Sequence, residues 1–227
     1  MALKTSIECV LFDLDGTLID TAPDFIKVMQ RLCAEQKTDA PTDRQIYQTV
    51  SDGARALVEL AFAVKEGEDE FPALRERLLD LYEEQLANTE ATLYPGMAML
   101  LDECDKQNIA WGIVTNKPEK YTRILLSNMA LLSRCRTLIC PEQVEFRKPH
   151  PEPIFMACQQ VACNTERTVY IGDHQRDMQA AKSADVIAIA ASYGYLGPDA
   201  KAEDWYADFI LKDPENIIDL LNLLQFA

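Results

Sequence analysis

Residues 10–17 read VLFDLDGT, an apolar run that meets two aspartates and a glycine. Residues 7–12 are short, apolar and rich in branched and aromatic side chains, which predicts a buried strand. Gly16 can adopt backbone angles that other residues avoid, so we expect the chain to turn there. Asp13 and Asp15 would then leave the strand on one face, because side chains alternate along a strand. Open α/β sheets bind ligands at that end of their strands.

The two carboxylates favour a cation site. Like charges this close repel each other unless a cation lies between them or one of them is protonated. The alternative is a solvated turn, since Asp and Gly are common turn residues. A calcium loop of the EF-hand type would need a bidentate Glu at its twelfth position. Counted from Asp13, that position is Asp24, so calcium is not expected.

The composition is typical of a globular protein and has a strong excess of acidic residues. The 227 residues are 48% hydrophobic and 26% charged, which suits one large domain or a core with a smaller insert. A net charge of −15 disfavours nucleic acid and anionic membranes as partners. An anionic substrate would therefore need local positive charge in its pocket.

The cysteines indicate a reducing compartment. The seven are scattered without a Cys-x-x-Cys pair, and the chain has only two histidines, so a zinc site is not expected. The first predicted strand leaves no room for a signal peptide, and no apolar run reaches membrane-spanning length. We expect a cytoplasmic protein.

The order of predicted elements indicates an α/β core interrupted by helices. Helical spacing dominates residues 20–90, where residues 21–24 resemble a capping box, Thr42 and Gln45 start a further helix, and residues 54–64 are apolar enough to be buried. From residue 91 helices and strands alternate, which predicts a parallel sheet with helices on both faces. The further strands are expected at residues 109–114, 137–140, 168–171, 185–190 and 208–211, and the helices at residues 97–107, 119–129, 152–161, 178–183 and 216–224.

Polar residues follow two of these strands in sequence. Residues 113–118 read IVTNKP, where Thr115 offers a hydroxyl and the amides near Asn116 offer an anion site. Simple helix capping by either residue is the alternative. Residues 147–153 read RKPHPEP, and the prolines present Lys148 from a stiff backbone that lowers the entropy cost of holding an anion. A proline-rich surface loop with a solvated lysine is the alternative there.

A last cluster lies in residues 170–177, which read YIGDHQRD. Asp173 leaves a predicted strand after a glycine, and Asp177 follows one helical turn later. Capping explains one of these carboxylates more easily than both, and neither histidine of the chain is assigned a role. All four clusters fall at carboxyl ends of predicted parallel strands, which independent turns would not be expected to produce.

In this order the four motifs resemble the haloacid dehalogenase superfamily, in its phosphatase branch with a helical cap after the first strand. The resemblance covers the whole chain. It implies a Rossmann-like parallel-sheet core of residues 1–19 and 91–227, with residues 20–90 as an all-helical cap. The sequence is similar to the phosphoglycolate phosphatases, and strings at residues 53–57, 139–142, 193–195 and 205–208 resemble the N-acetylmuramate 6-phosphate phosphatases of bacterial cell-wall recycling.

The resemblance implies a role for each carboxylate. Asp13 would attack phosphorus and form an aspartyl-phosphate, and Asp15 would protonate the leaving oxygen and then activate water. Mg²⁺ would be held by the Asp13 carboxylate, the Asp15 main-chain carbonyl and Asp173. Asp177 would support the metal shell or Lys148. The second Asp argues for phosphoryl rather than halide chemistry, because dehalogenases of the superfamily lack it.

The remaining site residues would bind the substrate. Lys148 and Thr115, with amides near Asn116, would hold the phosphate oxygens. The cap would exclude water and select the substrate, with Arg55 as the candidate for recognising a carboxylate or lactyl group. A solvated helix arginine is the alternative for Arg55. His174 stands where some relatives carry another Asp.

These features lead to one preferred function and two alternatives. We expect a Mg²⁺-dependent phosphomonoester hydrolase, monomeric or homodimeric, that acts on a small carboxylated or sugar phosphate. The substrates that the resemblance suggests are 2-phosphoglycolate and N-acetylmuramate 6-phosphate. A phosphomutase of the same branch and a non-catalytic acidic binding protein are the alternatives.

Overall fold

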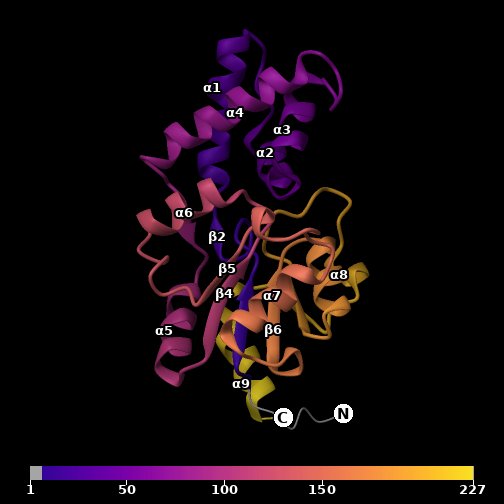
Figure 1. The fold of residues 1–227 in the computed structure, drawn as a ribbon. Helices are drawn as coiled ribbons and strands as arrows, with labels where there is room; N and C mark the ends of the chain where they lie inside the picture. Colours follow the sequence, from indigo (N-terminus) through magenta and orange to yellow (C-terminus); the bar gives the residue numbers. More distant parts are fainter. Residues whose placement is uncertain (1–6, 227) are drawn as a thin grey trace.

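A six-stranded parallel sheet forms the lower body of the protein, below a group of helices (Figure 1). The structure is a computed structural model that describes residues 7–226. The strands lie in the order β5-β4-β1-β6-β7-β8, and each adjacent pair is parallel. Their bounds are Cys9–Phe12 (β1), Ala110–Val114 (β4), Thr137–Ile139 (β5), Thr168–Gly172 (β6), Ile187–Ala191 (β7) and Phe209–Leu211 (β8). The predicted parallel α/β fold is confirmed.

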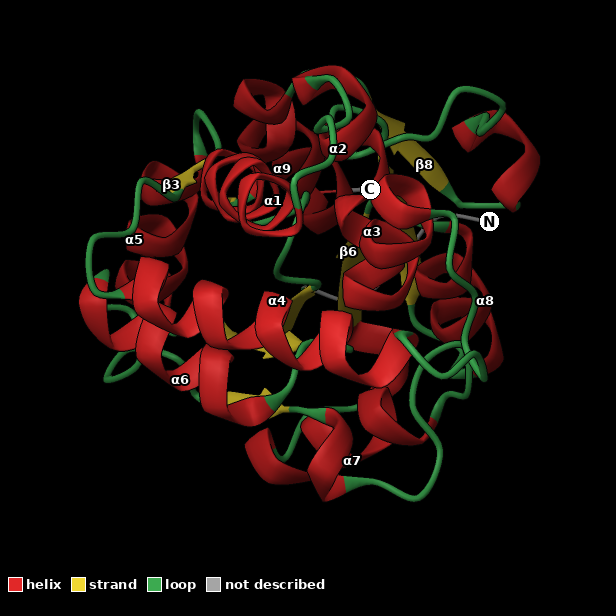
Figure 2. Ribbon diagram, turned by 90° about the horizontal axis from the view of Figure 1, so that it is seen from above, coloured by secondary structure: helices red, strands yellow, loops and turns green. Residues whose placement is uncertain are grey.

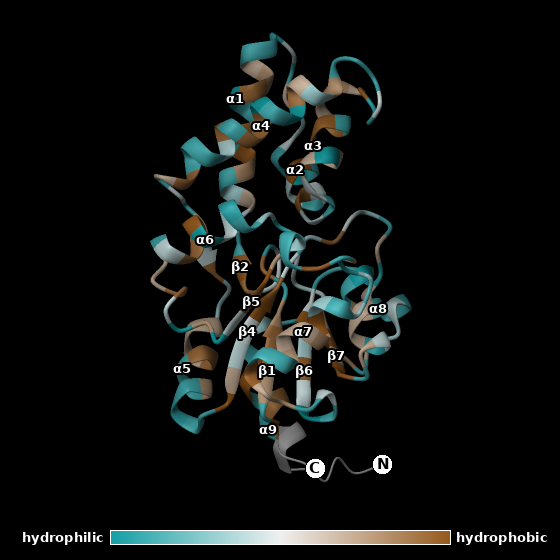
Figure 3. Ribbon diagram, in the orientation of Figure 1, coloured by the Kyte–Doolittle hydropathy of each residue, from teal (hydrophilic) through white to brown (hydrophobic). Residues whose placement is uncertain are grey.

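Alternation along the central strand builds a core on each face of the sheet. Val10 and Phe12 belong to one apolar cluster, whereas Cys9 and Leu11 belong to the other. Strands β1, β5 and β7 are brown (hydrophobic) in Figure 3, whereas β4 and β6 also carry paler residues. The first face is covered by α5 (Met97–Gln107), α6 (Glu119–Asn128) and α9 (Ile217–Phe226), and the second by α7 (Glu152–Val161) and α8 (Gln175–Ser183).

The order in which the chain adds strands to the sheet reverses at β1: β4 and β5 lie on one side of it, and β6, β7 and β8 on the other. The strand that follows in the sheet order is β4 on one side and β6 on the other, so the loops after these strands diverge. Such a switch point leaves a crevice at the carboxyl ends of the strands, which is where open α/β sheets bind ligands. The helical group lies directly above this edge (Figure 1).

The upper helices are inserted between two short strands. They are α1 (Ala22–Gln36), α2 (Asp43–Thr49), α3 (Gly53–Phe62) and α4 (Phe71–Leu86), between β2 (Ile19–Asp20) and β3 (Thr92–Leu93). Helices α1 and α4 pack together, with the rings of Phe25 and Tyr82 stacked at 4.3 Å. Figure 2 shows α4 lying across the top of the core, next to α6. These helices fall within the segment predicted as the cap, whose bounds as a domain stay a prediction.

The two ends of the helical insert are held together. Asp20 pairs with Thr92 in the antiparallel β2–β3 ribbon, which was not predicted. Asp24 is fully buried and accepts hydrogen bonds from the Thr89 hydroxyl at 2.5 Å and the Glu90 amide at 2.8 Å. The chain therefore enters and leaves the insert at nearly one point.

Three local predictions are wrong. The side chain of Thr21 does not cap α1 but bonds to Asp15, whereas Thr42 and Gln45 form a true capping box on α2. Within residues 54–64 only Leu57 and Val58 are buried, whereas Ala61, Phe62 and Val64 pack against the apolar core but stay partly exposed. Helix α8 begins three residues before the predicted start.

Candidate active site

Asp13 and Gly16 lie in the turn that directly follows β1. The strand finishes at Phe12, and the Asp13 carboxylate is 5% exposed and accepts a hydrogen bond from the Leu14 amide at 2.7 Å. Gly16 has φ +79°, and a Cβ on it would lie 2.1 Å from Oδ2 of Asp173. Only glycine fits both the backbone angle and this close approach.

A cluster of buried carboxylates lies below that turn. Asp13, Asp173 and Asp177 each place one oxygen within 4.8 Å of the others. Asp173 is completely buried and accepts from the Ser51 hydroxyl at 2.8 Å and the Tyr195 amide at 2.9 Å. Burial and the negative charges of the other two carboxylates raise the pKa of Asp173 to about 7. Such a group of hard oxygen ligands fits a divalent cation such as Mg²⁺.

Lys148 sits inside this cluster. Its Nζ lies 2.9 Å from Asp13 and 2.8 Å from Asp177, and it donates to the Val114 carbonyl at 2.9 Å and the Tyr170 hydroxyl at 2.8 Å. Burial opposes ionisation of Asp13, but the positive charge of Lys148 outweighs it and lowers the pKa of Asp13. Lys148 is 2% exposed, so the solvated-lysine alternative is wrong.

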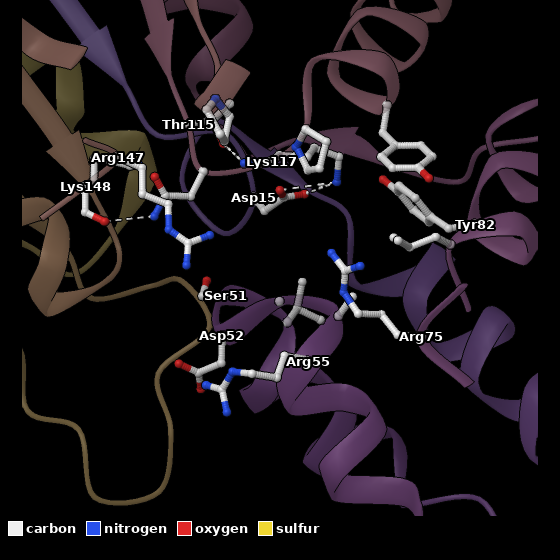
Figure 4. Close-up of a pocket in the computed structure, with 18 of the residues that line it drawn as sticks. Asp15, Ser51, Asp52, Arg55, Arg75, Tyr82, Thr115, Lys117, Arg147 and Lys148 are labelled. Carbon is white, nitrogen blue, oxygen red and sulfur yellow. Dashed lines mark hydrogen bonds and ion pairs between the residues drawn. The ribbon is translucent and has the colours of Figure 1, made fainter. Parts of the chain in front are cut away.

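Asp15 is held by a separate set of contacts. Its carboxylate accepts from Lys117 Nζ at 2.9 and 3.2 Å and from the Thr21 hydroxyl at 2.5 Å. The Lys117 ammonium lies over the rings of Tyr82 at 4.5 Å and Phe25 at 5.0 Å (Figure 4). Burial works against the charged form of Lys117, yet Asp15 raises the pKa of Lys117 above its usual range. Lys117 lies within the string IVTNKP, but no role was predicted for it.

Thr115 and Asn116 follow β4 at the same edge of the sheet. The Thr115 hydroxyl accepts from the Lys117 amide at 3.1 Å, and the Asn116 side chain donates to the Lys148 carbonyl at 3.0 Å. Both residues line the cavity described below, so the local bonds that the capping alternative expected coexist with access to a ligand. Their predicted contacts with a phosphate stay a prediction.

A cavity of about 760 Å³ separates the insert from the core (Figure 4). Asp13, Asp15, Thr115 and Lys148 line its lower wall. Arg55 lines the wall formed by α3, but its side chain is half exposed and its guanidinium pairs with Glu59 at 2.9 Å. The predicted recognition role of Arg55 stays a prediction.

A loop of the insert also reaches the carboxylate cluster. Ser51 bonds to Asp173, and Arg176 on α8 donates to the Ser51 carbonyl. His174 Nε2 lies 3.3 Å from Asp52, and His174 Nδ1 accepts from the Arg176 amide at 3.1 Å. No spacing in the sequence connects residue 51 with residue 173, so only the folded chain shows this contact.

The comparisons agree with the geometry. A family model for haloacid dehalogenase-like hydrolases matches residues 10–191. This chain belongs to that family. An N-acetylmuramic acid 6-phosphate phosphatase of Pseudomonas putida is 39% identical over 208 residues, covering 92% of this chain and 93% of the relative. A phosphoglycolate phosphatase of Xanthomonas campestris is 36% identical over 211 residues, with 92% and 93% covered. The chain is a phosphatase acting on phosphorylated small molecules.

Solved structures confirm the fold. A structure from Haemophilus somnus, described as a predicted phosphoglycolate phosphatase, aligns with a TM-score of 0.84 at 23% identity, covering 96% of this chain and 99% of that one. CbbY from Rhodobacter sphaeroides, solved with phosphate, aligns with a TM-score of 0.73 at 21% identity, covering 92% and 95%. Sequence identities of 21–23% support the fold alone.

Proposed function

We propose that this phosphatase hydrolyses N-acetylmuramic acid 6-phosphate through an aspartyl-phosphate on Asp13. The observation that carries the chemistry is the ionised Asp13 carboxylate at the floor of the cavity, 2.9 Å from the buried Lys148 ammonium. An ionised carboxylate is a nucleophile, and a preorganised cation stabilises charge on the phosphate oxygens during transfer. Thr115 and the amides near Asn116 would hold the same oxygens.

Mg²⁺ fits the carboxylate cluster. Asp13 and Asp173 would hold the ion with the Asp15 main-chain carbonyl, and the closeness of Asp177 supports it as a neighbour of that shell. The ion would neutralise the repulsion between Asp13 and a dianionic phosphate. Asp177 also pairs with Lys148, which supports its predicted positioning role.

Asp15 is suited to move the protons of both half-reactions. In the first, Asp13 attacks phosphorus and the Asp15 carboxyl gives its proton to the departing alcohol oxygen. In the second, the Asp15 carboxylate takes a proton from water, which attacks the aspartyl-phosphate and frees Asp13 and phosphate. The Lys117 ammonium at 2.9 Å and the Thr21 hydroxyl at 2.5 Å orient the Asp15 side chain for this role.

The cavity and the relatives support the larger of the two expected substrates. Ligand pockets commonly measure about 300–1,000 Å³, and a cavity of about 760 Å³ has room for an amino sugar with its side groups. A two-carbon ester such as 2-phosphoglycolate would leave most of that space to water. A relative from Pseudomonas aeruginosa, 37% identical with 96% of both chains covered, is also an N-acetylmuramic acid 6-phosphate phosphatase.

A phosphate-release panel with Mg²⁺ tests the proposal. The panel contains N-acetylmuramic acid 6-phosphate, 2-phosphoglycolate, glucose phosphates and a nucleotide monophosphate. We expect the first to give the highest kcat/KM, and release without a phosphorylated activator, which distinguishes hydrolysis from a mutase reaction. Faster hydrolysis of 2-phosphoglycolate would contradict the proposed substrate.

We further propose a cytoplasmic protein, monomeric or homodimeric, whose partner is this small metabolite rather than nucleic acid or a membrane. All seven cysteines are free, which supports a reducing compartment. The net charge of −15 supports the absence of polyanionic partners. Among residues 7–226, no helix has the length and apolar character needed to cross a membrane.

A further inference from the structure

Helix α4 lies along the cavity and turns one face toward it. Phe71, Arg75, Leu79 and Tyr82 of this helix line the cavity. Positions 75, 79 and 82 follow the i, i+4, i+7 spacing of one helix face. The wall therefore combines a phenyl ring and a leucine with a guanidinium and a phenol, from a helix that contributes nothing to the carboxylate cluster.

Arg75 offers an unused positive charge there. Its side chain is exposed and points from α4 into the cavity (Figure 4). Among residues 7–222 its side chain has no ion-pair or hydrogen-bond partner. Arg77, two positions along, is by contrast bound to Glu35 at 2.8 Å on the outer surface. In a chain with a net charge of −15, an arginine left free in the ligand cavity is available to an anion.

Tyr82 is the second observation that points to a ligand. It is 1% exposed, and its hydroxyl finds no hydrogen-bond acceptor among the residues whose side chains the structure describes. A buried hydroxyl without a partner is costly unless a ligand or water supplies one. The neighbouring Lys117 ammonium is a donor and cannot accept the phenolic proton. The Tyr82 hydroxyl therefore lacks an acceptor, and the cavity is where one can enter.

We propose that Arg75, assisted by the Tyr82 hydroxyl, binds a carboxylate on the organic part of the phosphate ester. A carboxylate accepts from both donors and balances the guanidinium charge. The substrate class is thus an organic phosphate with a carboxylate set apart from the phosphate, and apolar surface to cover Phe71 and Leu79. This inference rests on the proposed function and adds the residues that select the substrate.

A matched pair of substrates isolates the carboxylate. N-acetylmuramic acid 6-phosphate and N-acetylglucosamine 6-phosphate share the sugar, the acetamide and the phosphate, and only the first carries the lactyl carboxylate. The readout is the ratio of their kcat/KM values. We expect Arg75→Gln to lower this ratio about 10- to 100-fold, the effect of losing a hydrogen bond to a charged group. Tyr82→Phe should lower it several-fold.

Arg44→Gln is the control for charge. Arg44 lies on α2, is exposed, forms no ion pair among the described residues and does not line the cavity. Its loss changes the net charge of the protein equally and should leave the ratio unchanged. Thermal unfolding of each variant checks that the fold is intact.

The outcomes separate the two proposals. An unchanged ratio in Arg75→Gln, or equal losses on both sugar phosphates, contradicts recognition by Arg75 while leaving the proposed function standing. An unchanged ratio in Tyr82→Phe alone removes Tyr82 from the proposal. If the wild-type protein hydrolyses neither sugar phosphate, the proposed substrate itself is contradicted.

Discussion

Replacing Lys148 with methionine removes the charge at the centre of the site while keeping most of the side-chain volume. The substitution leaves Asp13 and Asp177 buried without their shared cation, and it leaves the Val114 carbonyl without that donor. Removing one partner from a buried ion pair costs about 3–5 kcal/mol. In a protein of this size that corresponds to a fall in Tm of roughly 6–20 °C.

Urea unfolding of wild type and Lys148→Met, in EDTA and at one pH, measures the free energy of unfolding. Lys182→Met is the matched control, because Lys182 pairs with Asp208 at 2.6 Å on the surface, where ion pairs contribute about 0–1 kcal/mol. Adding Asp177→Asn to Lys148→Met should recover part of the loss, since it removes one unpaired charge. A loss below about 1 kcal/mol for Lys148→Met would refute the electrostatic account of the cluster.

Four further predictions concern the reaction. Asp13→Asn should abolish turnover, since losing a nucleophile costs on the order of a million-fold; appreciable phosphate release would eliminate the covalent mechanism. EDTA should stop hydrolysis and Mg²⁺ should restore it, whereas activity that persists in EDTA counts against the metal. Because the pKa of Asp173 is raised to about 7, protons compete with Mg²⁺ below that pH, so the rise in Tm on adding Mg²⁺ should be larger at pH 8 than at pH 6; equal rises would contradict this. Arg55→Ala should impair N-acetylmuramic acid 6-phosphate more than a small generic ester, and equal losses would speak against recognition by Arg55.

Local patterns were sufficient to predict the fold. The apolar strand before Asp13 and the alternation after residue 91 depend on short-range periodicity, and the helices at residues 97–107 and 152–161 have the predicted bounds. The carboxylates that follow β1 and β6 could be placed together because neighbouring parallel strands end at one edge of a sheet. The β2–β3 ribbon was missed because two-residue strands carry no periodic signal.

The contacts between distant segments could not be predicted. Lys117 pairs with Asp15 across 102 positions, and Ser51 bonds to Asp173 across 122 positions. Such pairs depend on how the insert settles on the core, which a hydrophobic pattern does not specify. Arg55 pairs with Glu59, whereas Arg75 presents a guanidinium without an ion pair among residues 7–222, and its orientation is known only from the packing of α4 on α1.

The closeness of the two ends of the insert has an evolutionary consequence. Since Asp20 pairs with Thr92 and Asp24 bonds to the Glu90 amide, the helices hang from the sheet by one double-stranded stem. A segment attached in this way can be exchanged as a unit, because the chain connections of a replacement have to fit the core only at the stem, while its lower face must still pack against Asp173 and α6. Recombination at that point would give the same hydrolytic core a different helical insert, and with it a different substrate specificity.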